Sequence, residues 1–69
     1  MTGFRTVDGY LQNVEKDKHI IIINSHGDMI AGDSAENVLT NEYYYLVKDA
    51  LVVRTADAAD RLILYTQIQ

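Results

Sequence analysis

The chain has 69 residues, no cysteine, no proline and a formal net charge of −4 at pH 7. Its length predicts a single domain over residues 1–69, and the lack of cysteine excludes disulfides, thiolate zinc sites and a cysteine nucleophile. The negative charge disfavours nucleic-acid binding, because an acidic surface repels phosphate backbones. A domain this small without a covalent or metal staple often gains stability by association, so we expect a homo-oligomer.

The hydropathy pattern bears on where the protein works. The longest apolar run covers residues 20–23, far shorter than a membrane helix, so no membrane contact is expected. The first five residues carry one positive charge and no apolar stretch of the kind found in secretion signals. These features predict a cytoplasmic protein, and a viral or prophage origin is a further hypothesis.

The N-terminal half alternates between helix and strand signals. Val7, Tyr10, Leu11 and Val14 have helical spacing, although Gly9 weakens a helix there. Residues 19–24 contain four consecutive isoleucines, which favours a strand that is apolar on both faces and lies inside the sheet.

A turn and a helix cap are predicted after this strand. A two-residue turn at His26 and Gly27, with glycine supplying positive φ, pairs the strand with the next one and sets Ile23 opposite Ile30. Asp33 followed by Glu36 has the spacing of a capping box, which predicts a short helix over residues 34–39.

The C-terminal half admits two interpretations. Three aromatic and β-branched runs, at 43–47, 50–55 and 61–66, are typical of an antiparallel meander. The apolar spacing from 39 to 54 also fits a helix. The fold predicted is mainly β, an antiparallel meander or small barrel with one short helix; the alternative is α+β with helices near 6–16 and 35–54.

The meander interpretation predicts a binding surface. A four-residue loop at 57–60 pairs Val53 with Leu64, Val52 with Tyr65 and Arg54 with Ile63. Alternation then gives one core face, consisting of Tyr44, Leu46, Leu51, Val53, Leu62 and Leu64. The opposite face supplies the candidate interface residues Tyr43, Tyr45, Val52, Arg54, Ile63 and Tyr65. Tyrosine and arginine are enriched at the centres of protein interfaces, which favours a protein-binding role.

No catalytic or metal site is predicted. The isoleucine strand ending at His26-Gly27 resembles the histidine loop of caspase-like cysteine proteases over about ten residues, but this chain lacks the nucleophilic cysteine of that family. Ser25, His26 and Asp28 share one tight loop and cannot converge as a triad. His19 lies seven positions from His26 on a strand, which disfavours a shared metal. We therefore expect neither enzymatic activity nor a cofactor.

Residues 9–14, followed by 19–24 and Met29-Ile30, resemble the bent-strand opening of Sm-like RNA-binding barrels. The resemblance implies ring formation and RNA binding, although the chain lacks the basic residues of an RNA path. The main functional hypothesis is a small acidic, non-enzymatic protein-binding module that self-associates, with a regulatory, inhibitory or accessory role. The alternative is an Sm-like or tyrosine-stacking small barrel that binds nucleotides or RNA.

Overall fold

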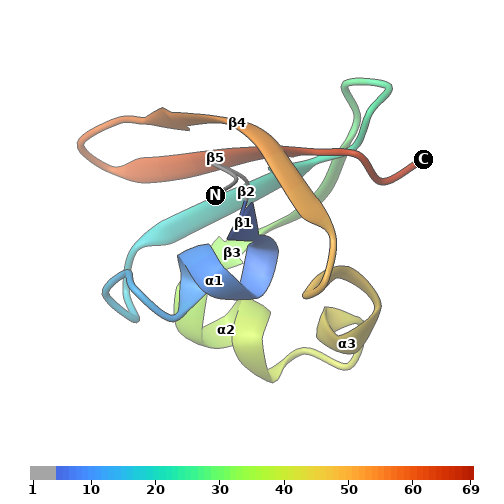
Figure 1. Ribbon diagram of the computed structural model, residues 1–69. Coiled ribbons are helices and arrows are strands. Elements are labelled where there is room, and N and C mark those ends of the chain that lie inside the picture. Colours follow the sequence, from blue (N-terminus) through green and yellow to red (C-terminus); the bar gives the residue numbers. More distant parts are fainter. Residues whose placement is uncertain (1–4) are drawn as a thin grey trace.

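The computed structural model describes residues 5–69, which place a five-stranded sheet on one side of three short helices (Figure 1). In chain order the elements are β1 (Arg5–Thr6), α1 (Val7–Leu11), β2 (His19–Ile23), β3 (Met29–Ser34), α2 (Ala35–Thr40), α3 (Tyr44–Val47), β4 (Leu51–Asp57) and β5 (Arg61–Thr66). Strands hold 40% of the structure and helices 23%, which confirms the expected strand-rich class with short helices. Within residues 5–69 no helix is long and apolar enough to cross a membrane.

The sheet is mixed rather than purely antiparallel. Its strand order is β1-β4-β5-β2-β3, so β5 lies between β4 and β2. The β2–β3 and β4–β5 pairs are antiparallel, whereas β2 and β5 run parallel. The purely antiparallel pairing expected of a meander is therefore wrong at this junction. The helical connection from β3 to β4 crosses one face of the sheet, so that β5 runs in the same direction as β2.

The first helix is shorter than the pattern over 6–16 predicts. The Thr6 hydroxyl accepts a hydrogen bond of 3.1 Å from the Gly9 N–H and caps α1, while Val7 and Leu11 are buried. The chain leaves the helical path after Gln12. One turn and a half is enough to bury both apolar residues against the sheet.

The β2–β3 hairpin forms where it was predicted. Gly27 has φ of +87°, and the Asn24 side-chain oxygen accepts 2.9 Å hydrogen bonds from the His26 and Asp28 N–H groups. The predicted pairing of Ile23 with Ile30 is wrong, because a β-bulge places Met29 opposite Ile23.

The cap of α2 lies one residue later than predicted. Ser34 is the N-cap, and its hydroxyl accepts a hydrogen bond from the Asn37 N–H at 3.3 Å. The Asp33 carboxylate accepts from the Ser34 N–H and from the Asn37 amide instead. The predicted cap is thus one residue early: the Ser34 hydroxyl accepts from the helix backbone, and the Asp33 carboxylate holds the Asn37 side chain.

The segment 43–47 is helical, so the predicted strand there is wrong. The alternative of one helix over 35–54 is also wrong, because Asn41 has extended backbone (φ −76°, ψ 147°) and separates α2 from α3. Tyr44 and Val47, three residues apart, both enter the core. A strand would have pointed them to opposite faces, so burial of this pair favours the helical turn.

The β4–β5 register also differs from the prediction. Arg54 lies opposite Tyr65 and Val52 lies opposite Thr66, with a bulge between them. The loop is tighter than expected, since the Ala58 N–H donates to the Arg61 carbonyl at 2.8 Å. The bulge moves Val52 to the helix side of the sheet, away from the face that carries Arg54.

The core lies between the helices and one face of the sheet. Its buried apolar residues are Val7, Leu11, Ile20, Ile22, Ala31, Ala35, Val38, Tyr44, Val47, Val52, Leu62 and Leu64. Of the predicted core face, Tyr44, Leu62 and Leu64 are buried as expected. Leu46, Leu51 and Val53 are exposed, because α3 replaces the first predicted strand and the bulge in β4 changes the alternation.

Candidate functional site

The side of the sheet away from the helices carries an apolar surface that no helix of residues 5–69 covers (Figure 1). Ile20, Ile22, Leu62 and Leu64 point toward the helices and are buried, and the residues that alternate with them point the other way. We name this surface the open face and define it by Ile21, Ile23, Ile63, Tyr65 and Arg54.

The parallel register brings the open-face residues of β2 and β5 together. Ile21 lies beside Ile63, and Ile23 lies beside Tyr65; all four are only half-buried. On the far side of β2, a Cβ added to Gly32 would approach the Met29 sulfur to 3.1 Å, so the thioether lies over that glycine. The apolar surface therefore continues from β5 across β2 to β3.

Arg54 forms the border of the open face on β4. Its guanidinium carbon lies 4.1 Å from the centroid of the Tyr65 ring, a cation–π contact across the β4–β5 pair. Among the described residues, no carboxylate forms a salt bridge with Arg54. The side chain is thus held in place by an aromatic ring while its charge stays available to a partner.

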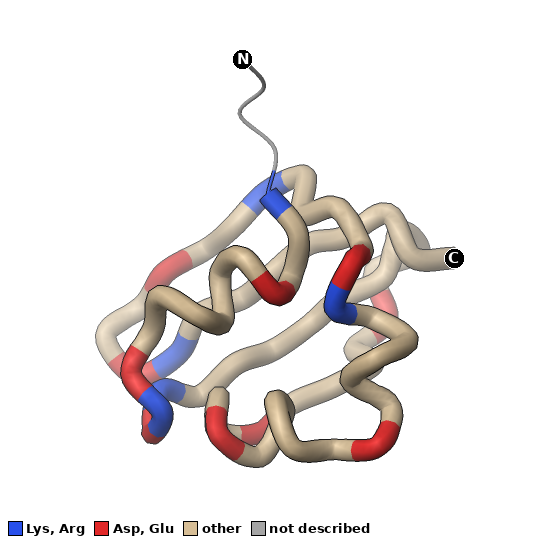
Figure 2. The backbone as a smooth tube through the Cα atoms, turned by 60° about the horizontal axis from the view of Figure 1, so that its bottom comes forward, with Lys and Arg blue, Asp and Glu red and all other residues tan. Residues whose placement is uncertain are grey.

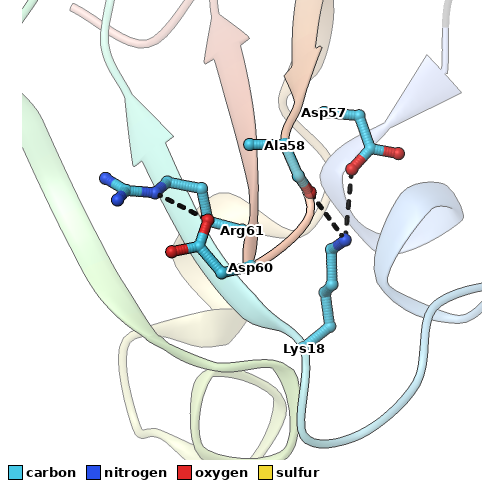
Figure 3. Close-up of polar contacts among 5 residues, drawn as sticks. All are labelled: Lys18, Asp57, Ala58, Asp60 and Arg61. Atoms are coloured by element: carbon cyan, nitrogen blue, oxygen red, sulfur yellow. Dashed lines mark hydrogen bonds and ion pairs between the residues drawn. The ribbon is translucent and has the colours of Figure 1, made fainter.

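Two further charged contacts lie at the opposite end of β5, near the hairpin loop (Figure 3). The Lys18 ammonium is 3.1 Å from the Asp57 carboxylate and donates to the Ala58 carbonyl at 3.1 Å. Arg61 Nε is 3.4 Å from the carboxylate of its neighbour Asp60, and both side chains are exposed. Lys18 thus connects the β4–β5 loop to the residue that precedes β2. Arg61, like Arg54, lies on the same side of the sheet as Ile63.

A shallow hollow of about 970 Å³ adjoins the open face. The turn at 24–27, Arg54, Tyr65 and the residues after β5 line it. His26 lies there in an exposed turn, where its backbone N–H donates to the Asn24 side-chain oxygen. Among residues 5–69, no three His, Asp or Glu side chains are grouped so that they could hold a metal ion.

One polar contact with a clear electrostatic effect lies on the helix side. The Tyr44 hydroxyl donates a hydrogen bond to the Asp8 carboxylate and connects α3 to α1. This bond, with smaller contributions from Gln12 and Lys48, lowers the pKa of Asp8 below its usual value. Burial, reinforced by Asp8, raises the pKa of the Tyr44 phenol. The pair is remote from the open face and joins two elements of the fold.

The structure separates the six predicted interface residues into three groups. Arg54, Ile63 and Tyr65 lie together on the open face. Val52 is 3% exposed and belongs to the core. Tyr43 and Tyr45 lie at α3 on the helix side, where Tyr45 is 69% exposed.

Sequence reasoning missed Ile21 and Ile23 as members of the open face, and Met29 as its apolar neighbour on β3. The isoleucine run was a usable signal, since it showed that β2 is apolar on both faces. It did not show which face remains uncovered, because that depends on where the helices pack.

Comparisons with protein-family models, curated proteins and solved structures found no match to this chain.

Proposed function

We propose that this chain is a non-enzymatic protein-binding module and that the open face is its contact surface. The observation that carries the proposal is the parallel β2–β5 pair, which is apolar on both sides and covered on one. Strands that are apolar on both faces, as in all-parallel sheets, are typically covered on both. A protein partner supplies the missing layer.

The chemistry of the open face supports a protein partner. Its middle combines isoleucines with Tyr65, and Arg54 contacts the Tyr65 ring from the border. Tyrosine and arginine are among the residue types most enriched at the energetic centres of interfaces. Four strands at about 4.8 Å spacing and five residues at about 3.3 Å give a footprint of roughly 300 Å². This is smaller than the roughly 800 Å² that each partner buries in a standard interface, so the open face forms the apolar centre of a larger contact.

The proposal also covers the cellular role, the location and the self-association of the protein. We propose a regulatory, inhibitory or accessory role in the cytoplasm, of the kind that viruses and prophages often encode in small acidic proteins. Self-association is one way of covering the open face. Neither the proposed protein-binding role nor self-association requires a cofactor.

Site-specific photo-crosslinking tests the proposal directly. A benzophenone side chain replaces Ile63, at the middle of the open face, and in a matched control it replaces Thr40, exposed at the end of α2. We expect a partner protein to be crosslinked to the probe at position 63 and not to the probe at position 40. The purified partner should then bind Ile63→Glu at least about tenfold more weakly than the control Ala59→Glu, as is typical of a central interface residue. Equal crosslinking from both positions would contradict the proposal.

A planar ligand such as a nucleobase is the second candidate. Tyr65 is half-exposed beside a cation, an arrangement that can stack a base. Tyr43 and Tyr45, however, lie at α3 on the helix side, so they cannot form one stacking platform with Tyr65 on β5. This separation makes binding of several stacked bases less favourable. Titration with oligonucleotides and nucleotides at low salt, followed by tyrosine fluorescence, decides this: an unchanged signal excludes stacking on Tyr65.

A further inference from the structure

The parallel strands β2 and β5 end at the same edge of the sheet, and the hollow of about 970 Å³ lies there. Figure 1 shows the β2–β3 turn and the chain that follows β5 at this end of the molecule. The two segments are joined, because the Ser25 N–H donates to the Ile68 carbonyl at 2.7 Å. Three segments thus line the hollow: the turn at 24–27, residues 53–54 of β4, and the end of β5 with the residues after it.

Hydrogen bonds fix the walls of the hollow. The Thr66 hydroxyl donates to the Ile23 carbonyl at 2.9 Å and accepts from the Ile68 N–H at 3.3 Å. In the turn, the Asn24 side-chain oxygen accepts from the His26 N–H at 2.9 Å. A site whose backbone is already held in place loses little chain entropy when a ligand binds.

The exposed side chains on these walls are hydrogen-bond donors. Within residues 5–69, no hydrogen bond or salt bridge engages the side chains of Ser25, His26, Arg54 or Gln67. Each of the four carries an N–H or O–H group that can donate. The Arg54 guanidinium is also held in position, 4.1 Å from the centroid of the Tyr65 ring. The hollow therefore offers donors from all three of the segments that line it.

The charge of the hollow differs from that of the whole chain. The sequence contains ten Asp and Glu residues, and Figure 2 shows them at many points of the backbone from the helix side. None of the ten lines the hollow; Asp28 follows directly after Gly27 but is not part of the lining. Among the residues that line it, Arg54 is the one Lys or Arg. No side-chain carboxylate on the walls therefore competes with a bound anion for Arg54.

We propose that this hollow binds the phosphoryl group of a small organic phosphate. Arginine pairs with phosphate through two parallel N–H···O bonds. A phosphate monoester carries three strong acceptor oxygens and a charge of about −1.5 to −2 at pH 7. Donors on three sides suit oxygens in a tetrahedral arrangement better than the two coplanar oxygens of a carboxylate.

The size and lining of the hollow leave room for the organic part of the ligand. Its volume lies within the roughly 300–1,000 Å³ that is typical of small-molecule sites. The half-buried Tyr65 and the exposed Val53 line it and offer apolar contact. This ligand site is additional to the protein contact proposed for the open face, and the two share Arg54.

Titration followed by ¹H–¹⁵N NMR tests for the site. The probe is phenyl phosphate, and inorganic phosphate and phenol represent its two parts. We expect phenyl phosphate to bind with a Kd of about 1 mM or tighter and to shift the signals of residues 24–27, 53–54 and 65–67. Inorganic phosphate should shift the same signals at higher concentration, and benzoate should bind more weakly than phenyl phosphate. Absence of these shifts at about 10 mM phenyl phosphate, or the same shifts with phenol, would overturn the proposal.

Two arginine variants distinguish a specific site from general attraction to positive charge. Arg54→Gln should raise the Kd for phenyl phosphate at least about tenfold, as is typical when a charged hydrogen-bond partner is removed. The matched control Arg61→Gln removes the same charge at the opposite end of β5 and should change the Kd by less than about twofold. Both arginines are exposed, and thermal melting checks that both variants are folded. Equal losses in the two variants would overturn the proposal.

A neutral variant tests the turn without changing the charge of the protein. Ser25→Ala removes one hydroxyl donor from the lining and should raise the Kd about threefold. An unchanged Kd would contradict the placement of the phosphoryl group against the turn.

Gln69 also lines the hollow, so its carboxyl group is a competing partner for Arg54. The titration is therefore repeated with protein in which the carboxyl group of Gln69 is amidated. We expect the Kd to stay within about fivefold, since exposed charges interact weakly. Binding that is seen only in the amidated protein would overturn the proposal.

The phosphate site and the protein contact fail separately. If phenyl phosphate does not bind while the crosslinker at position 63 captures a partner, the ligand site is excluded and the proposed function stands. If phenyl phosphate binds as expected while no partner is captured, the ligand site stands without the protein contact.

Discussion

Neighbouring residues on β5 should differ sharply in their contribution to stability. Leu64 is fully buried against the helices, whereas Ile63 lies half-buried on the open face. Leu64→Ala should lower the free energy of unfolding by about 3–5 kcal/mol, since a cavity adds to the lost transfer energy. For 69 residues, at roughly 0.05–0.15 kcal/mol each, the total is only about 3–10 kcal/mol.

The companion variant Ile63→Ala should cost far less. It removes three methyl or methylene groups at about 0.8 kcal/mol each when fully buried, so half-burial gives roughly 1 kcal/mol. Urea denaturation of both variants at low micromolar concentration measures the two values, with an unchanged m-value as the control for two-state unfolding. Equal losses would refute the assignment of Ile63 to an uncovered face, because they would show that its side chain is as enclosed as that of Leu64.

Three further predictions concern local features of the fold. Gly27→Ala should lower the free energy of unfolding by about 1–2 kcal/mol, because φ of +87° is strained for alanine; an unchanged thermal midpoint would contradict this. Ser34→Ala should cost about 1 kcal/mol by removing the α2 cap, measured by chemical denaturation against the exposed control Ser25→Ala. Because the pKa of Asp8 is lowered in the folded state, its stabilising effect is present above the carboxyl pKa of about 3.9 in the unfolded chain and is lost as pH falls through the lower folded value. Tyr44→Phe should therefore melt earlier than wild type at neutral pH, and the difference should shrink below about pH 4; a constant difference would refute the linkage.

The sequence predicted those elements that depend on neighbouring residues. The isoleucine strand, the turn at Gly27 and the helix start near Asp33 each follow from local sterics or hydrogen bonding, and all three are present in the structure. The predicted placement of Arg54 and Tyr65 on the same face of the sheet agrees with the structure, although the predicted register paired Arg54 with Ile63 instead of Tyr65.

Other features depend on contacts that no local pattern specifies. The aromatic run 43–47 favours a strand by residue type, and the burial of Tyr44 together with Val47 decides for a helical turn instead. The bulge at Val53 reverses the side on which Val52 points, which alternation cannot anticipate. The parallel alignment of β2 with β5 joins residues 19 and 61, and only the path of the intervening helices determines it.

The central place of β5 has a consequence for folding and for aggregation. The β2–β3 hairpin can form early because its strands are adjacent in the chain, but its isoleucine-rich β2 remains an edge until β5 pairs with it. Pairing β2 with β5 brings residues 19 and 61 together, and closing a loop of that length is slow compared with forming a hairpin. During that interval, or after local detachment of the β4–β5 hairpin, the five-residue strand β2, which has no charge at its centre, is exposed to other chains. Detachment of the β4–β5 hairpin from β2 is therefore expected to create a partially folded state with an aggregation-prone strand edge.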